Sequence, residues 1–286
     1  MAGFTFESHP LPSFGRDVDF DLSRPLDDEQ QQALRDLLYG NGLLVFRNQS
    51  LSDDDQTRVL GHFGRVLVEE GGHREISVDG NLGNCALIFH SDLAFTAEPF
   101  KLLSLYAIDV DDGATSTLFA SGSEAFAKLP AVLRERAESI DVATVIPPSQ
   151  TERAVTYETP DFLPQITGPA VIAHPVTGRP FLNVFEMQTS RVEGLPPKES
   201  EALLQELFGY LYAPGNVYEH VWHKGDLVIW DNLALQHGRR DQQATGRRRL
   251  RRIAVADKTF FQLCPQFASD DPRILAWGSG AKLMVA

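Results

Sequence analysis

Cysteine is nearly absent from this sequence. The 286 residues include only Cys85 and Cys264, which lie far apart and form neither a CxxC pair nor any spacing typical of a zinc site. The sequence therefore indicates neither a disulfide framework nor a structural zinc ion. So few cysteines suit a reducing compartment, and we expect a cytoplasmic protein.

Basic residues and long apolar runs are also scarce. The chain has 26 Lys and Arg residues against 39 Asp and Glu residues, a formal net charge of −13. This balance argues against nucleic acid or an anionic membrane as the main partner. No stretch approaches the roughly 18 apolar residues of a membrane span, and the N-terminal sequence MAGFTFESHP lacks a basic segment followed by an apolar one. Small molecules are the expected ligands, and a homo-oligomer stays open.

The residues that are present suit a single domain over residues 1–286, because 43% are hydrophobic and no linker or repeat divides them. Capping patterns predict helices that begin near residues 26–29 and 52–55, and others within 121–128, 132–139 and 198–212. Apolar runs predict strands within 43–48, 87–95, 101–110, 115–120, 217–222, 225–232 and 250–257, and a hairpin within 171–184. This order favours a mainly β fold with flanking helices (α+β), a double-sheet jelly roll.

A His-x-Asp pair stands in one of these apolar runs. Phe89-His90-Ser91-Asp92 places an imidazole and a carboxylate two residues apart, and on a β-strand residues i and i+2 project from the same face. We therefore expect the side chains of His90 and Asp92 to converge. With a second histidine they would complete the two-histidine, one-carboxylate triad that holds non-haem Fe(II) and leaves coordination positions open.

Spacing alone does not identify the second histidine, because six others lie at reachable distances: His62, His73, His174, His220, His223 and His237. The surroundings single out His237. It follows the apolar run 225–232, which ends in polar residues, and precedes the basic segment 247–252. An inward-facing arginine in this basic segment would suit a dicarboxylate cosubstrate. One carboxylate end of the cosubstrate can chelate the metal while the other end pairs with the guanidinium.

Six motifs arrive in a characteristic order between about Leu43 and Phe260. They are Phe89-His90-Ser91-Asp92, Thr115–Phe119, His174–Arg179, Trp222 with Gly225–Asn232, Gln236-His237, and Arg247–Arg252. Together they resemble the Fe(II)/2-oxoglutarate-dependent dioxygenases of the taurine dioxygenase (TauD/TfdA) family. The resemblance implies a double-stranded β-helix (jelly-roll) core, a ferrous centre, and 2-oxoglutarate and O₂ as cosubstrates.

The resemblance also assigns the iron ligands. His90, Asp92 and His237 match the three protein ligands of the family. In such enzymes 2-oxoglutarate is decarboxylated to succinate and CO₂ while an unactivated C–H bond of the substrate is oxidised. Related halogenases lack the carboxylate ligand, so the presence of Asp92 argues against halogenation.

Three further residues match cosubstrate or substrate contacts of the family. Thr117, 25 residues after the matching aspartate, corresponds to a hydroxyl that hydrogen-bonds the distal carboxylate of 2-oxoglutarate. Arg248, 11 residues after the second histidine, corresponds to the arginine that pairs with the same carboxylate. Arg252 corresponds to an arginine that faces the active site. Because side chains alternate along a strand, Arg248, Leu250 and Arg252 are expected to share one face, and the arginines between them to face the other way.

The sequence departs from taurine dioxygenase beside the site. The family's substrate-contacting asparagine, four residues before His90, corresponds to Ala86 here, so taurine is not the expected substrate. The acids Glu69 and Glu70 lie in the glycine-rich segment 65–86, predicted to be a loop, and would suit an amine. We expect hydroxylation or desaturation of a small polar, amino-acid-like or biosynthetic substrate. The alternative is a non-catalytic jelly-roll protein that keeps the pocket as a ligand sensor.

Overall fold

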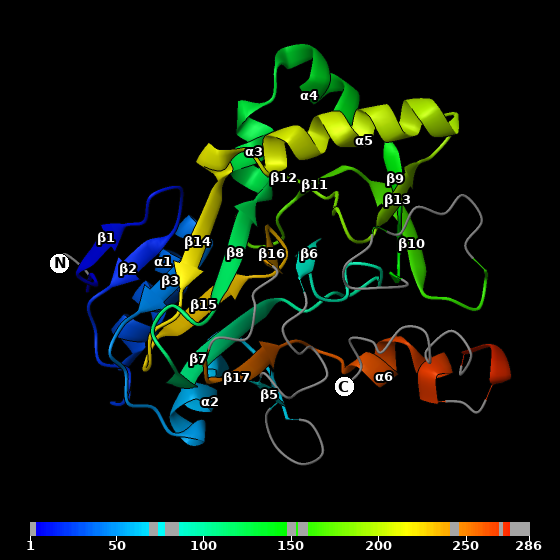
Figure 1. The fold of residues 1–286 in the computed structure, drawn as a ribbon. Helices are drawn as coiled ribbons and strands as arrows, with labels where there is room; N and C mark the ends of the chain where they lie inside the picture. The colour runs from blue at the N-terminus through cyan, green and yellow to red at the C-terminus, as the bar shows by residue number, and fades with distance from the viewer. Residues whose placement is uncertain are drawn as a thin grey trace.

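Two β-sheets face each other at the centre of the protein, with helices on their outer sides (Figure 1). The structure, a computed structural model, describes residues 4–68, 74–77, 86–147, 153, 160–240, 246–268 and 271–274. Its strands are β1 (Ser8–Pro10), β2 (Arg16–Val18), β3 (Leu43–Phe46), β4 (Val66–Leu67), β5 (Arg74–Ser77), β6 (Leu87–His90), β7 (Leu102–Val110), β8 (Ser116–Ser121), β9 (Asp141–Val145), β10 (Gln165–Pro169), β11 (Val171–Ala173), β12 (Pro180–Leu182), β13 (Thr189–Val192), β14 (Val217–Val221), β15 (Leu227–Asp231), β16 (Leu235–Arg239) and β17 (Arg248–Val255). Its helices are α1 (Asp28–Asn41), α2 (Asp53–Gly61), α3 (Gly122–Lys128), α4 (Ala131–Glu138), α5 (Pro197–Leu211) and α6 (Phe260–Leu263), with 3₁₀ turns η1 (Pro214–Asn216) and η2 (Pro265–Ala268).

The larger sheet has the strand order β1-β2-β3-β15-β7-β17-β4, with β5 paired to β17. The smaller sheet has the order β14-β8-β16-β6. Strands β2 and β3 are parallel, and the other neighbouring strands of the two sheets are antiparallel. Strands distant in sequence therefore lie side by side in two stacked sheets, which is a jelly-roll arrangement. The predicted mainly β fold with flanking helices is confirmed.

Strand β15 runs through the middle of the larger sheet and is buried on both faces. Leu227 and Ile229 pack in the hydrophobic cluster that contains Leu34 of helix α1. Val228 and Trp230 point the other way, into the hydrophobic cluster between the two sheets. Burial on both faces explains why this strand reads as a continuous apolar run in the sequence.

Helices α1 and α2 cover the outer face of the larger sheet and begin where the sequence predicts. Asp27 and Ser52 each form a capping box at the start of a helix. Helix α1 ends at Asn41 and is capped by Gly42, whose φ of 78° is left-handed. Helix α2 ends at Gly61, and Gly64 beyond it has a φ of 149°, outside the helical range.

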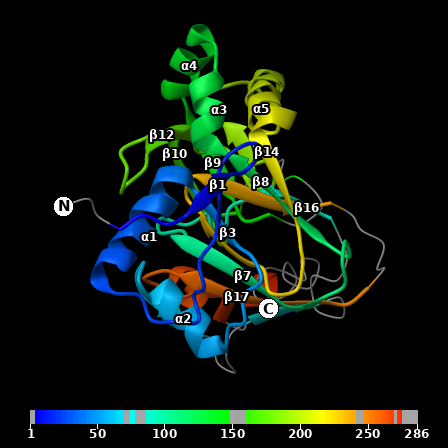
Figure 2. The same ribbon diagram turned by 90° about the vertical axis from the view of Figure 1, so that its left-hand side faces the viewer.

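Helices α3, α4 and α5 gather at the top of the molecule in both views (Figures 1 and 2). They share a hydrophobic cluster with strands β9 and β13, to which α5 contributes Leu203 and Leu207. The predicted hairpin is the pair β11–β12, and its turn contains Gly178 with a φ of 67°. Among the described residues, no helix is long and apolar enough to cross a membrane.

Segment 65–86, predicted to be a loop beside the site, contains the short strands β4 and β5, and both pair with β17. The glycine-rich composition gave no sign of these strands. They form by pairing with β17, about 170 to 190 residues later in the chain. Glu69 and Glu70, proposed from the sequence to favour an amine, lie outside the described residues, as does His73. Leu67 and Ile76 from the described strands do reach the interior between the sheets.

Candidate active site

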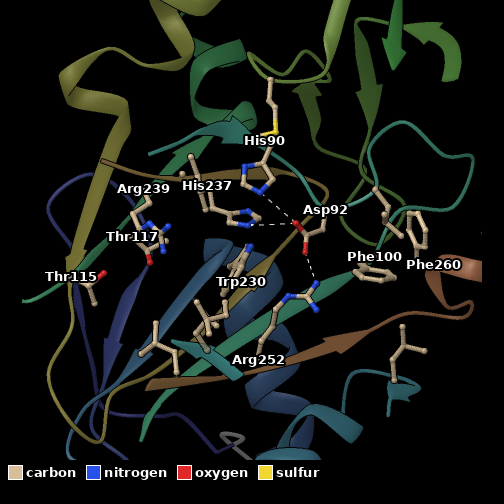
Figure 3. Close-up of a pocket in the computed structure, with 18 of the residues that line it drawn as sticks. His90, Asp92, Phe100, Thr115, Thr117, Trp230, His237, Arg239, Arg252 and Phe260 are labelled. Atoms are coloured by element: carbon tan, nitrogen blue, oxygen red, sulfur yellow. Dashed lines mark hydrogen bonds and ion pairs between the residues drawn. The ribbon is translucent and has the colours of Figure 1, made fainter. Parts of the chain in front are cut away.

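A cavity of about 530 Å³ opens between the two sheets. Strands β17, β7 and β15 supply its wall from the larger sheet, and strands β6, β8 and β16 supply the opposite wall. The lining residues are Leu67, Val68, Ile76, Leu87, His90, Asp92, Leu93, Phe100, Leu105, Thr115, Thr117, Met187, Trp230, His237, Gly238, Arg239, Arg248, Leu250, Arg252, Thr259, Phe260 and Phe261. All six residues selected from the sequence therefore line one cavity, and Figure 3 shows several of them.

His90, Asp92 and His237 meet in the wall of this cavity (Figure 3). The Nε2 atoms of the two histidines each lie 3.6 Å from Oδ1 of Asp92, and the ring centroids lie 4.2 Å apart. The three side chains offer ligand atoms within 4.8 Å of one another. Nδ1 of His90 lies 2.9 Å from the carbonyl oxygen of Ile88, and donation to this oxygen would leave the Nε2 lone pair directed at the shared space.

The two halves of this cluster converge for a different reason from the predicted one. Strand β6 ends at His90, so Asp92 lies in the following turn and not on the same strand face. His237 lies on strand β16, directly opposite His90 in the β16–β6 ladder. Cross-strand pairing therefore joins the histidines, and the turn after β6 brings the carboxylate back to them.

Side-chain amides hold the backbone of this turn. Asn232 accepts a hydrogen bond from the N–H of Asp92 at 2.9 Å and donates one to its carbonyl at 3.0 Å. Gln188 forms the same pair of bonds with Ser91, at 3.2 and 2.8 Å. The next residue, Leu93, has a φ of 62°, which a bulky side chain rarely adopts. The two amides thus fix Asp92 in a turn that its own sequence does not favour.

The environment sets the charges of the three groups. Burial lowers the pKa of His90, and it lowers the pKa of His237 to about 3, so both imidazoles are neutral near pH 7. Burial alone would raise the pKa of Asp92, but the guanidinium of Arg252 and the two histidines outweigh it and hold this pKa well below its ordinary value. Two neutral imidazoles and one carboxylate are a donor set that fits a divalent iron ion.

The arginines of β17 alternate as the sequence predicts. Arg248, Leu250 and Arg252 line the cavity, whereas Arg251 turns to the other face and lies 5.0 Å from the ring centre of Tyr106. The buried Arg248 donates to the carbonyl of Ser77 at 3.1 Å. The guanidinium of Arg252 donates to Oδ2 of Asp92, the carboxylate oxygen that does not face the histidines.

Thr117 faces the cavity from strand β8, and its hydroxyl accepts a hydrogen bond of 2.9 Å from the indole N–H of Trp222. Arg239 lies beside it in Figure 3, buried in the cavity wall on β16. The sequence reading missed Arg239. Its place two residues after His237 would have indicated the shared face, had β16 been recognised as a strand.

The alternative histidines among the described residues do not line the cavity: His62, His174, His220 and His223. Nδ1 of His174 accepts from the N–H of Val176 within the β11–β12 turn, and Nε2 of His174 lies 2.9 Å from Asp231 at the end of β15. The other oxygen of Asp231 accepts from the N–H of Leu233. Asp231 therefore fixes the turn between β15 and β16.

Known proteins resemble this chain along most of its length. A family model described as taurine catabolism dioxygenase TauD, TfdA family, matches residues 7–254. The alpha-ketoglutarate-dependent 2,4-dichlorophenoxyacetate dioxygenase of Cupriavidus pinatubonensis is 30% identical over 282 residues, which cover 87% of this chain and 96% of the relative. The alpha-ketoglutarate-dependent sulfate ester dioxygenase of Pseudomonas putida is 28% identical over 259 residues, which cover 82% of this chain and 83% of the relative.

Solved structures show the same fold. The crystal structure of AAD-2 in complex with Mn(II) and N-oxalylglycine matches with a TM-score of 0.74 at 24% identity, over 90% of this chain and 99% of that chain.

Alpha-ketoglutarate is 2-oxoglutarate, so the predicted enzyme class and its requirement for Fe(II), 2-oxoglutarate and O₂ are confirmed, and the non-catalytic alternative loses its support. The chain belongs to the TauD/TfdA family of Fe(II)- and 2-oxoglutarate-dependent dioxygenases.

Proposed function

We propose that His90, Asp92 and His237 hold the ferrous iron of this dioxygenase. The supporting observation is their convergence, as two neutral imidazoles and one ionised carboxylate, in a buried cavity wall. Bound there, iron would supply the activation of O₂ that is coupled to decarboxylation of 2-oxoglutarate. The protein itself positions the target C–H bond and excludes water from it.

Thr117 and Arg248 are proposed to bind the distal carboxylate of 2-oxoglutarate. Both are buried and line the cavity from facing sheets, Thr117 on β8 and Arg248 on β17. A guanidinium can donate two parallel hydrogen bonds to a carboxylate, and a hydroxyl can donate a third. A cation and a hydroxyl in the same enclosed space therefore suit a carboxylate better than a neutral group.

Arg252 is proposed to bind an anionic group of the substrate or cosubstrate. Its guanidinium donates to Asp92 and lies 5.6 Å from the ring centre of Phe100. A guanidinium carries five N–H donors, so Arg252 can hold Asp92 and still donate to a ligand. This double role would place the substrate anion close to the proposed iron.

The cavity lining favours an apolar substrate body with an anionic group. Leu87, Leu93, Phe100, Met187 and Leu250 line it, and aliphatic and aromatic walls bind apolar groups. The two relatives named above act on 2,4-dichlorophenoxyacetate, a carboxylate with an aromatic ring, and on sulfate esters. We therefore propose hydroxylation of an unactivated C–H bond in such an anion. The small polar, amino-acid-like substrate expected from the sequence stays a prediction, as does desaturation.

Two measurements test this function. Addition of Fe(II) and 2-oxoglutarate without oxygen is expected to produce a weak visible charge-transfer band, and its absence would contradict the proposed site. Succinate release is then measured against aryloxy carboxylates, alkyl sulfate esters, sulfonates and amino acids. Preferred turnover of amino acids would overturn the apolar-anion proposal while leaving the enzyme class intact.

Loss of the hydrogen bonds that the Asn232 side chain donates is expected to weaken metal binding. Asn232→Asp replaces the amide N–H donors with an oxygen, which removes the bonds to the carbonyls of Asp92 and Phe100. Partners of metal ligands typically contribute about 10–100-fold to metal affinity, so a loss in this range is expected in a Mn(II) titration. Asn183→Asp removes a 3.2 Å bond to the carbonyl of Pro169, and because neither residue lines the cavity, this variant is the matched control. Equal Mn(II) affinity in both variants would show that the hydrogen bonds donated by Asn232 do not position Asp92.

A further inference from the structure

A buried indole stands behind the cavity wall at Thr117. Trp222 follows strand β14, is fully buried, and does not line the cavity. Its Nε1–H donates to Oγ1 of Thr117 at 2.9 Å, and its backbone N–H donates to the carbonyl of Thr115 at 3.1 Å. Any effect of Trp222 on a ligand in the cavity is therefore indirect, and Thr117 is the lining residue to which its indole donates.

The indole bond determines what the Thr117 hydroxyl can do. An indole N–H can only donate, so Thr117 is the acceptor of this bond and retains its own proton. Among the residues that the structure describes, none accepts that proton from Thr117. The hydroxyl lines the cavity and is therefore available there as a donor. An ionised carboxylate accepts hydrogen bonds and donates none, so it matches this hydroxyl.

Neighbouring groups hold the indole in place. The ring of His220 lies edge-on to Trp222, with centroids 4.5 Å apart and an interplanar angle of 80°. His220 is itself held on both nitrogens, because Nε2 lies 3.1 Å from Asp226 and Nδ1 lies 3.3 Å from the hydroxyl of Tyr218. Arg47 in turn contacts Asp226 at 2.8 Å. A fixed buried donor polarises the bond that follows it, which strengthens the next donation in the chain.

We propose that Trp222 is a positioning residue for the cosubstrate: its indole N–H directs the Thr117 hydroxyl to donate to the distal carboxylate of 2-oxoglutarate. The inference rests on the proposed function of Thr117 and adds a residue that never touches the ligand. It predicts that the contribution of the indole N–H depends on the hydroxyl it serves.

A double-mutant cycle measures this dependence. Trp222→Phe keeps a buried aromatic ring but removes the N–H donor together with one ring of the indole, and the Kd of 2-oxoglutarate, measured by anaerobic calorimetry on the Fe(II) protein, is expected to rise about 5–10-fold. Thr117→Val should raise this Kd at least as much. Thr117→Ser, which keeps the hydroxyl, should raise the Kd less than about twofold. In the Thr117→Val background, Trp222→Phe is expected to add less than about twofold.

The outcomes separate the possibilities. If Trp222→Phe weakens binding by the same factor with and without the Thr117 hydroxyl, the indole has only a packing role and the proposal is overturned. If Trp222→Phe does not fold, Thr117→Val remains decisive, because wild-type affinity in that variant would show that the hydroxyl donates nothing to the ligand. A wild-type protein that binds no 2-oxoglutarate would instead refute the proposed cosubstrate site, and the inference with it.

Discussion

His237→Ala is expected to lower succinate release by more than about 100-fold, which is the largest effect predicted for this protein. Residues that merely support a metal ligand contribute about 10–100-fold, so removal of a ligand should cost more. The variant leaves His90 and Asp92, two donors that cannot complete the facial triad. The measurements are succinate release at saturating Fe(II) and 2-oxoglutarate, and the anaerobic charge-transfer band, which should vanish.

His223→Ala is the matched control for this prediction. Its side chain is 54% exposed and lies 3.7 Å from Asp226, and the residue does not line the cavity. Its activity is expected to stay within about twofold of wild type, because substitutions at exposed positions away from a site have small effects. Equal loss of activity in the two variants, or a normal band in His237→Ala, would contradict the assignment of His237 as a ligand.

The sequence predicted the members of the candidate site better than the reason for their convergence. His90, Asp92 and His237 were selected by motif order, and the structure brings them together. The strand alternation invoked for Asp92 was wrong, because the side chain reaches the histidines through a turn. Alternation is a local property and held where the strand continued, as along β17.

The residues that were missed depend on contacts that no local pattern records. Asn232 meets Asp92 across 140 residues, and the hydroxyl of Thr117 meets Trp222 across 105. Each such pair is set by the register of strands that are distant in sequence, which one sequence does not display. In the sequence, Trp222 ends one apolar run and Asn232 ends the next. Both descriptions are true of the local chain and leave out the partner.

The cavity thus combines two chemical environments. The region around Thr117 carries hydrogen-bond donors and buried cations, Arg239 and Arg248, whereas side chains such as Phe100 and Met187 supply apolar walls. Guanidinium and hydroxyl groups donate hydrogen bonds to carboxylates. A dicarboxylate therefore suits the region around Thr117, and an apolar substrate body suits the remaining walls of the cavity.

Arg248→Met is expected to raise the Kd and KM for 2-oxoglutarate about 100-fold, with little change in kcat once the cosubstrate is saturating. Methionine keeps a long side chain but removes the charge, and a hydrogen bond to a charged group is worth about 1.5–3 kcal/mol. Two such bonds from one guanidinium correspond to roughly 3 kcal/mol, and each 1.4 kcal/mol is tenfold in affinity. The measurements are anaerobic calorimetry and the dependence of succinate release on 2-oxoglutarate concentration.

Two further variants decide whether geometry or charge alone matters at this position. Arg248→Lys keeps the charge but not the planar fork, so an intermediate loss of about tenfold is expected if the carboxylate is bound by two parallel bonds. Arg249→Met, the adjacent residue, removes an exposed guanidinium paired with Glu75 at 2.7 Å and should leave the Kd unchanged. If Arg249→Met weakened the binding of 2-oxoglutarate as much as Arg248→Met does, the basic segment would act through its overall charge. The alternation that turns only Arg248 and Arg252 into the cavity would then not explain cosubstrate binding.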